Sequence, residues 1–312
     1  MKQRTSLICI ALLLLMEANS FGLSLNPFTL FGFISPQHRV KVIPPQESAV
    51  KAVIFDLDGV LFTTSHKMYA HIAPYLPLYA IHRLYNMQGL NIKEHYLEVL
   101  AQLKGDSKEV VIHDGKAVSP IMIDWLTGQD VAQTAIEQLE NNQNLSYADK
   151  KLMVAIASRI FNPVEFINSR QVIPQGLQLL KALKDKGYKV YVLSNWDAQS
   201  FPILKEKFPE IMNLFDGFLI SGDAKTLKPK KAIFKMFLSK FNLKAKDCIF
   251  IDDQPSNVDA AEKKANIRSV LFDRKDVVPA LKKLESFGVL TVIDTTESTT
   301  SNNKQTSPSS HE

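Results

Sequence analysis

Pairs of acidic residues stand at the ends of two apolar segments of the sequence. Asp56 and Asp58 close one β-branched apolar run, and Asp252 and Asp253 directly follow another. Burying such carboxylates costs free energy unless a cation or hydrogen bonds neutralise them. A strand that simply ends in an Asp-Gly turn is the alternative explanation for the first pair. A divalent cation would neutralise both pairs, and Mg²⁺ is the usual one in phosphoryl chemistry.

Three further side chains could bind an anion. Ser194 and Asn195 follow the apolar run at residues 189–193, and Lys228 precedes the first turn of a predicted helix at Pro229. A hydroxyl, an amide and an ammonium group near a helix start can all bind phosphate oxygens. Capping of the next helix, or a solvated lysine, is the alternative for each. If all these groups share one site, their charges predict a metal and a phosphate side by side.

Alternating strands and helices must position these side chains. Apolar composition predicts strands at residues 49–57, 189–193, 218–221, 248–251, 269–272 and 289–293. Amphipathic spacing predicts helices at residues 174–186, 230–240, 258–265 and 277–287. This order indicates an α/β fold, a Rossmann-like parallel sheet covered by helices on both faces. Parallel strands end at one edge of the sheet, so we expect the candidate residues to meet in one crevice there.

A long segment interrupts this alternation after the first acidic pair. Between residues 66 and 160, apolar residues recur every three or four positions, which is typical of amphipathic helices. We interpret residues 63–170 as a mostly α-helical insert. The core is then formed by residues 47–62 and 171–293.

The first twenty residues have the layout of a secretory signal peptide. Lys2 and Arg4 precede an apolar run at residues 7–16, and Ala18 and Ser20 supply the small residues of a cleavage site. The apolar run is too short to span a bilayer. An uncleaved anchor, extended by the apolar residues that follow, is the alternative. The pattern predicts export to a periplasm or to the medium, with no stable membrane span after cleavage.

Two further segments lack the periodicity of regular structure. Residues 21–46 carry four prolines and are interpreted as a linker. Residues 294–312 are rich in serine and threonine and have no apolar side chain, so we expect a disordered tail. The role of that tail is not identified by its composition.

Composition excludes several classes of protein. The 312 residues are 46% hydrophobic and 22% charged, which fits a globular chain and rules out a collagen-like or multi-spanning one. The formal net charge is only +5 and no dense basic run occurs, so nucleic acid is not an expected partner. After signal cleavage Cys248 would be the only cysteine, and its apolar surroundings predict a buried, inert thiol.

The four motifs, taken in order, resemble those of one superfamily. The segments FDLDGVLF, VLSNW, LKPKKAIF and FIDDQPSNVDAA are similar to the four motifs of the haloacid dehalogenase-like (HAD) hydrolases. The resemblance covers residues 50–62 and 172–272. The insert between the first two motifs resembles the helical cap of the first type, although no motif within it identifies specificity residues.

The resemblance implies roles for the acidic residues. Asp56 would be the nucleophile that takes the phosphoryl group. Asp58 would protonate the leaving oxygen and then activate water. Mg²⁺ would be held by Asp56, by the Asp58 carbonyl and by Asp253, with Asp252 as a water-mediated or orienting partner.

The resemblance also implies roles for the remaining candidates. Ser194, the Asn195 amide and Lys228 would bind the phosphate and stabilise the charge of the transition state. Asn257 would hold the fourth motif in place. Trp196 is expected to pack and Asp197 to cap a helix, with the lining of the substrate pocket as the alternative.

The acidic residue at position 58 favours one activity within the superfamily. Dehalogenating members lack an acid there, so the resemblance implies a Mg²⁺-dependent phosphatase with a small phosphorylated substrate, for example a sugar phosphate, and an aspartyl-phosphate intermediate. A phosphosugar mutase is the enzymatic alternative. A non-enzymatic secreted binding or effector protein on the same scaffold is the other.

Overall fold

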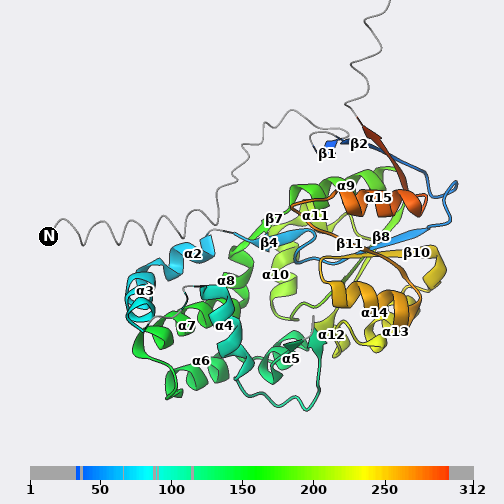
Figure 1. Ribbon diagram of the computed structural model, residues 1–312. Coiled ribbons are helices and arrows are strands. Elements are labelled where there is room, and N and C mark those ends of the chain that lie inside the picture. The colour runs from blue at the N-terminus through cyan, green and yellow to red at the C-terminus, as the bar shows by residue number, and fades with distance from the viewer. Residues whose placement is uncertain are drawn as a thin grey trace, which may run out of the picture.

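The computed structural model describes residues 33–35, 38–65, 67–86, 89, 91–113 and 116–294. These residues form two lobes: an α/β core and a helical cap (Figure 1). The predicted signal peptide lies outside the described residues, as do residues 295–312 of the predicted tail.

A five-stranded parallel sheet forms the centre of the core. Its order is β11-β10-β3-β8-β9. The strands are β3 (Ala52–Phe55), β8 (Lys189–Ser194), β9 (Gly217–Ile220), β10 (Cys248–Asp252) and β11 (Arg268–Leu271). Every residue of β3 and β10 is buried, as expected for parallel strands covered on both faces. The sheet confirms the predicted α/β fold class.

Helices cover both faces of this sheet because side chains alternate along each strand. Val53 and Val192 point into one apolar cluster with α9 (Pro174–Asp185), α10 (Ser200–Lys207), α11 (Pro209–Met212) and α15 (Val278–Ser286). Ile54 and Leu193 point into the other cluster, with α13 (Lys231–Lys240) and α14 (Pro255–Ala265). Figure 1 shows α9 and α15 on one side of the sheet and α13 and α14 on the other.

Cys248 begins the central strand β10. The side chain is fully buried in the second apolar cluster, and burial raises the pKa of its thiol to about 12. A thiol that remains protonated and covered is unreactive. The predicted burial of this cysteine is therefore confirmed.

The predicted strand at residues 289–293 forms but does not join the parallel sheet. It is β12 (Leu290–Asp294), and it pairs antiparallel with β2 (His38–Val42), which pairs with β1 (Phe33–Ser35). Residues 33–35 and 38–42, within the segment interpreted as a linker, therefore form two strands that the sequence did not predict. The prolines concealed the alternation of β2, whose Val42 is buried in the core cluster together with Leu290.

The cap consists mainly of helices. They are α2 (Lys67–Ile72), η1 (Ala73–Tyr75), α3 (Leu76–Tyr85), α4 (Ile92–Ala101), α5 (Pro120–Leu126), α6 (Ala132–Asn141), α7 (Tyr147–Ile160) and α8 (Pro163–Asn168). A short hairpin joins β5 (Ile112–His113) to β6 (Lys116–Ala117). Asn91, Ser146 and Asn162 start α4, α7 and α8, because each side chain accepts a hydrogen bond from the main-chain N–H three residues on. The cap has an apolar cluster of its own.

The chain crosses between the lobes twice, along two paired strands. β4 (Phe62–Thr64) leaves the core and β7 (Arg170–Val172) returns to it, in antiparallel register with Thr64 opposite Arg170. The predicted borders of the insert, at residues 62/63 and 170/171, lie within this pair. Both crossings therefore lie beside the end of β3, where the first acidic pair stands.

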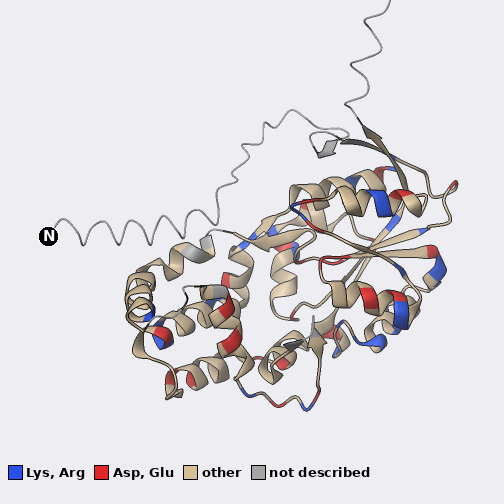
Figure 2. Ribbon diagram, in the orientation of Figure 1, with Lys and Arg blue, Asp and Glu red and all other residues tan. Residues whose placement is uncertain are grey.

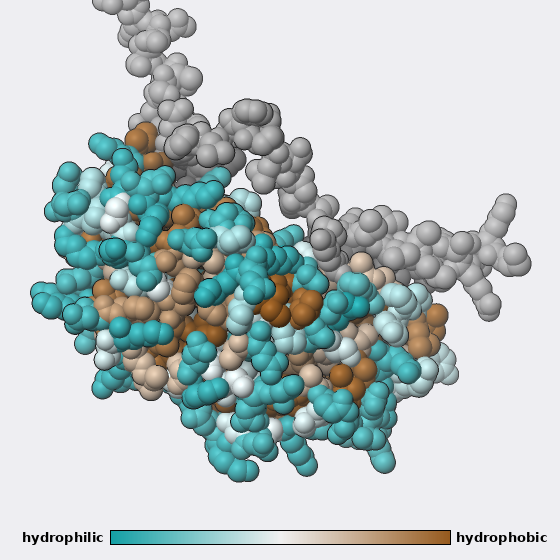
Figure 3. All heavy atoms as spheres, turned by 180° about the vertical axis from the view of Figure 1, so that it is seen from behind, coloured by the Kyte–Doolittle hydropathy of each residue, from teal (hydrophilic) through white to brown (hydrophobic). Residues whose placement is uncertain are grey.

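Neither lobe shows a surface dominated by one kind of side chain. Acidic and basic positions are interspersed over both lobes (Figure 2). The face seen from behind is mainly hydrophilic, with apolar groups in small separate patches (Figure 3). Among the described residues, no helix combines the length and apolar character needed to cross a bilayer.

Candidate active site

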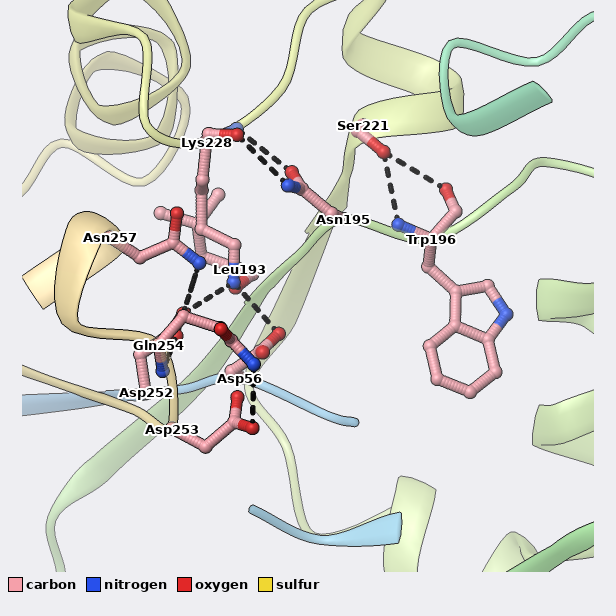
Figure 4. Close-up of polar contacts among 10 residues, drawn as sticks. All are labelled: Asp56, Leu193, Asn195, Trp196, Ser221, Lys228, Asp252, Asp253, Gln254 and Asn257. Atoms are coloured by element: carbon pink, nitrogen blue, oxygen red, sulfur yellow. Dashed lines mark hydrogen bonds and ion pairs between the residues drawn. The ribbon is translucent and has the colours of Figure 1, made fainter. Parts of the chain in front are cut away.

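Three carboxylates meet at the carboxyl ends of the two central strands. Asp56 follows β3, Asp252 is the last residue of β10, and Asp253 comes next in the chain. One carboxylate oxygen from each lies within 4.8 Å of the others. Parallel pairing of β3 with β10, with Phe55 opposite Ile251, brings these strand ends to the same level. The structure thus brings together the acidic residues from the first and fourth motifs (Figure 4).

A fully buried lysine neutralises part of this charge. Lys228 Nζ lies 2.8 Å from Asp56 Oδ1 and 2.7 Å from Asp252 Oδ2, and it donates a hydrogen bond to the Leu193 carbonyl at 3.0 Å. Its side chain has no exposed surface. Lys228 therefore holds two carboxylates in place at the site where the sequence predicted a contact with phosphate.

Asp252 is held from three directions. Besides Lys228, its carboxylate accepts hydrogen bonds from the Gln254 main-chain N–H at 2.8 Å and from Asn257 Nδ2 at 3.1 Å. The residue is completely buried. Asn257 thus fastens the start of α14 to the end of β10, where the resemblance placed it. Asp252 has the environment of an orienting residue, whereas Asp253 remains partly accessible.

Ser194 and Asn195, at the end of β8, contact the same group of residues. The Asn195 side chain accepts from the Lys228 N–H at 2.8 Å and donates to the Lys228 carbonyl at 3.0 Å. It therefore fixes the loop that carries the lysine, and only its main-chain amide remains for an anion. The buried Ser194 hydroxyl lies beside Asp56 and lowers the pKa of that carboxyl.

Burial and like charges disturb the ionisation of the carboxylates. Burial raises the pKa of Asp56 to about 6, against the opposing effect of Lys228. Burial, together with Asp56 and Asp252, raises the pKa of Asp253 to about 8. Burial alone would lower the pKa of Lys228, but its two aspartate partners raise it. The lysine stays charged and the carboxylates still carry excess negative charge, so a hard divalent cation fits this oxygen-rich donor set.

Asp58 borders the space between the lobes. Its Oδ1 accepts a hydrogen bond from Arg170 Nη1 at 2.9 Å, and the guanidinium stacks on the ring of Phe166 at 4.2 Å. The Asp58 side chain is 55% exposed, but the protein walls around it raise its pKa despite the ion pair with Arg170. The sequence analysis missed Arg170, because no local pattern marks a residue placed here by the second crossing strand.

Gly59 allows the first motif to approach the fourth. Its φ is +81°, and a Cβ at this position would lie 2.2 Å from Asp253 Cγ. A side chain there would have to displace the carboxylate. The glycine of the Asp-Gly turn thus fixes the separation of Asp58 and Asp253.

Trp196 and Asp197 stabilise the loop after β8. Trp196 is buried, packs edge-on against Phe166 with ring centroids 5.3 Å apart, and donates from Nε1 to Ser200 Oγ. Asp197 accepts from the N–H groups of Gln199 and Ser200 at the start of α10. The predicted packing and capping roles are confirmed, and both residues also line the cavity between the lobes.

Two adjoining cavities open from this centre. A cavity of about 240 Å³ is bordered by Asp56, Lys228 and Asp253. A larger one of about 1120 Å³ extends from Asp58 and Asp253 to the helices of the cap. The small cavity can hold a phosphate-sized group beside Asp56, while the large one can hold whatever that group is attached to.

Comparisons with known proteins agree with this geometry. The family model described as "haloacid dehalogenase-like hydrolase" matches residues 50–263. A sesquiterpene phosphatase of Aspergillus oryzae is 36% identical over 84 residues, 27% of this chain and 42% of that protein. The bifunctional epoxide hydrolase 2 of Rattus norvegicus is 28% identical over 131 residues, 41% of this chain and 23% of that protein. The chain spans less than half the length of both of these relatives.

Solved structures of low sequence identity also match. A HAD family enzyme of Bacteroides thetaiotaomicron, solved with magnesium and inorganic phosphate, is 20% identical with a TM-score of 0.46, covering 74% of this chain and 98% of that one. A predicted phosphoglycolate phosphatase of Haemophilus somnus is 20% identical with a TM-score of 0.42, covering 76% and 92%. The family model spans most of the chain, including the three strand ends and the Lys228 loop that build the site, so the protein belongs to the haloacid dehalogenase-like hydrolases.

Proposed function

We propose that this hydrolase is a Mg²⁺-dependent phosphatase that cleaves an organic phosphomonoester through an aspartyl phosphate on Asp56. The observation that carries the proposal is the meeting of Asp56, Asp252 and Asp253 within 4.8 Å, beside a buried lysine and a small cavity. The similarity to a sesquiterpene phosphatase supports the reaction class.

Asp56 would act as the nucleophile. Lys228 holds its Oδ1, which leaves the second oxygen to attack phosphorus from the side of the small cavity. The P–O bond to the substrate alcohol breaks as the bond from Asp56 to phosphorus forms. The Ser194 hydroxyl, the main-chain amide of Asn195 and the lysine charge would stabilise the negative oxygens of the transition state.

Asp58 would transfer the protons. In the first step its carboxyl gives a proton to the leaving alcohol oxygen, and in the second step its carboxylate takes a proton from the water that attacks phosphorus. Its raised pKa suits this double role, because both protonation states are then accessible. Arg170 orients the carboxyl toward the cavity by binding one of its oxygens.

The carboxylates fit a magnesium ion by their number, their oxygen chemistry and their excess charge. Asp56, Asp253 and the main-chain carbonyl of Asp58 would hold the ion, with Asp252 acting through water or by orienting Lys228. Bound there, Mg²⁺ would supply positive charge to the phosphate oxygens and keep the nucleophile ionised.

Hydrolysis of p-nitrophenyl phosphate tests the proposal. We expect turnover with Mg²⁺ and its loss in EDTA, with an Asp56→Asn variant inactive under both conditions. Absence of turnover by the parent chain in either condition would favour a binding or effector protein instead. Interconversion of sugar phosphate isomers without release of phosphate would favour a mutase.

We also propose that the chain is exported. The charged start, the short apolar run and the small residues around Ser20 support this proposal by composition. The mass of the mature amino terminus tests it, because cleavage after Ser20 gives one defined value. An intact Met1 on the exported protein would contradict cleavage.

A further inference from the structure

We infer that the large cavity binds the apolar body of the substrate, so that the enzyme acts on the monophosphate of a bulky hydrocarbon alcohol and not on a sugar phosphate. The inference rests on the proposed phosphatase function. It names the class of substrate that the sequence analysis left open, and it departs from the example of a sugar phosphate.

The cavity has two walls of different chemistry. On the core side it is bordered by Asp58, Arg170 and Asp253. On the cap side, α2, α4, α5, α7 and α8 all contribute, and every lining residue from Met68 to Phe166 is aliphatic, aromatic or methionine. Leu97, Met122 and Ile160 belong to this apolar wall. No charged side chain is found among the described residues of that wall.

The apolar wall begins where the polar site ends. Arg170 donates a hydrogen bond to Asp58 in the polar site, and its guanidinium stacks on Phe166, which is part of the wall. Trp125 packs edge-on against Phe166 with ring centroids 5.3 Å apart and continues the wall. A phosphate held beside Asp56 would therefore direct its organic part along these rings and away from the carboxylates.

A polyhydroxylated substrate would find few partners on this wall. The Tyr96 hydroxyl is buried there and makes no hydrogen bond among the described residues, so the wall offers little hydrogen bonding beyond this group and the Trp125 indole N–H. Hydroxyl groups placed against the wall would lose hydrogen bonds to water without replacement. A hydrocarbon would gain from the same transfer.

The size of the cavity agrees with this chemistry. Its volume of about 1120 Å³ is far larger than phosphate requires and slightly exceeds the usual range for ligand sites, roughly 300–1,000 Å³. Leu97 is 53% exposed even though it stands on this wall, so apolar surface is left open to water. This apolar surface borders the same cavity as Asp58 and Asp253, so it is the place for the apolar group of the substrate.

Binding of n-alkylphosphonates to the full chain with Mg²⁺ tests the inference without turnover, because their C–P bond is not hydrolysed. With chains of four to ten carbons kept below the micelle concentration, we expect affinity, measured by calorimetry, to rise roughly threefold to fourfold per methylene until the cavity is filled. The kcat/KM of the matching alkyl phosphates should rise in parallel. Affinity independent of chain length would overturn the inference.

Two leucines of similar exposure on the cap supply a matched pair of variants. Leu97→Glu on α4 places a charge on the apolar wall, whereas Leu84→Glu on α3 places one outside it, at 50% exposure. We expect the chain-length dependence to flatten in Leu97→Glu and to persist in Leu84→Glu. Equal slopes in both would overturn the inference. If either glutamate lowers the folded fraction, Leu97→Ser and Leu84→Ser give the same comparison.

The outcomes separate this inference from the proposed function. Chain-length-dependent binding without hydrolysis of any phosphate would support the apolar site and contradict the phosphatase. Hydrolysis of glucose 6-phosphate with a higher kcat/KM than octyl phosphate would support the phosphatase and overturn the apolar site.

Discussion

The two sides of the active-site cavity are formed by different interactions. The core side holds Asp56, Asp252 and Lys228 rigidly, because the buried lysine pairs with both carboxylates. The cap side is an apolar surface with few directional contacts. The reaction and the choice of substrate therefore depend on different residues. A substitution in the core should change catalysis and stability, while a substitution in the cap wall should change substrate preference alone.

The largest effect should come from Lys228→Met. Removing one partner from a buried ion group leaves Asp56 and Asp252 unpaired, and we expect unfolding free energy to fall by about 3–5 kcal/mol and phosphatase activity to be lost. Denaturant unfolding measures the first and phosphate release the second.

Lys189→Met is the matched control at the opposite end of β8. Lys189 pairs with Asp216 at 3.0 Å but is 65% exposed, so its loss should destabilise the fold far less than the loss of Lys228. Equal losses for both variants would show that burial does not distinguish the two ion pairs.

The stability of the metal-free protein should depend on pH. Carboxyls of the unfolded chain titrate near 3.8, but those of folded Asp56 and Asp253 titrate at about 6 and about 8. Between about pH 4 and pH 8 the folded state therefore binds more protons than the unfolded chain does. In EDTA, unfolding free energy should fall by several kcal/mol as pH rises from about 4 to 8.

Thermal unfolding at several pH values measures this effect. Mg²⁺ should restore more stability at pH 8 than at pH 5, and Asp253→Asn should flatten the slope. A metal-free stability that rises steadily from pH 5 to pH 8 would show that the carboxylates are not crowded in solution.

Gly59→Ala should damage the metal site more than the fold. The left-handed φ of +81° costs about 1–3 kcal/mol for alanine, and the new Cβ displaces Asp253. We expect Mg²⁺ affinity to fall roughly 10- to 100-fold. Gly187→Ala has a similar φ of +89° with no atom within 4 Å of the new Cβ, so it shares the strain but should keep Mg²⁺ affinity.

The smallest effect should come from Arg170→Met. Arg170 lowers the pKa of Asp58, so its removal should move the Asp58 limb of the pH–rate profile to higher pH. Arg159→Met is the control, because Arg159 pairs with Glu165 in the cap. The same displacement in both variants would exclude a specific role for Arg170.

The core could be predicted largely from local sequence. Apolar runs followed by Asp56, Ser194 and Asp252 indicated strand ends, and parallel pairing places such ends at one edge. The strand β2 was missed because prolines flank it. The last strand was placed in the wrong sheet because an apolar run predicts a strand but not its partner.

Residue type and strand position were enough to indicate that acidic groups from distant segments meet at one edge of the sheet. Tertiary structure alone decided that Lys228 binds the aspartates, that Arg170 reaches Asp58, and that Leu97 and Ile160 face a cavity. Helical periodicity shows that a helix has an apolar face but not whether that face is packed or left open, because this depends on how separate helices are placed in space.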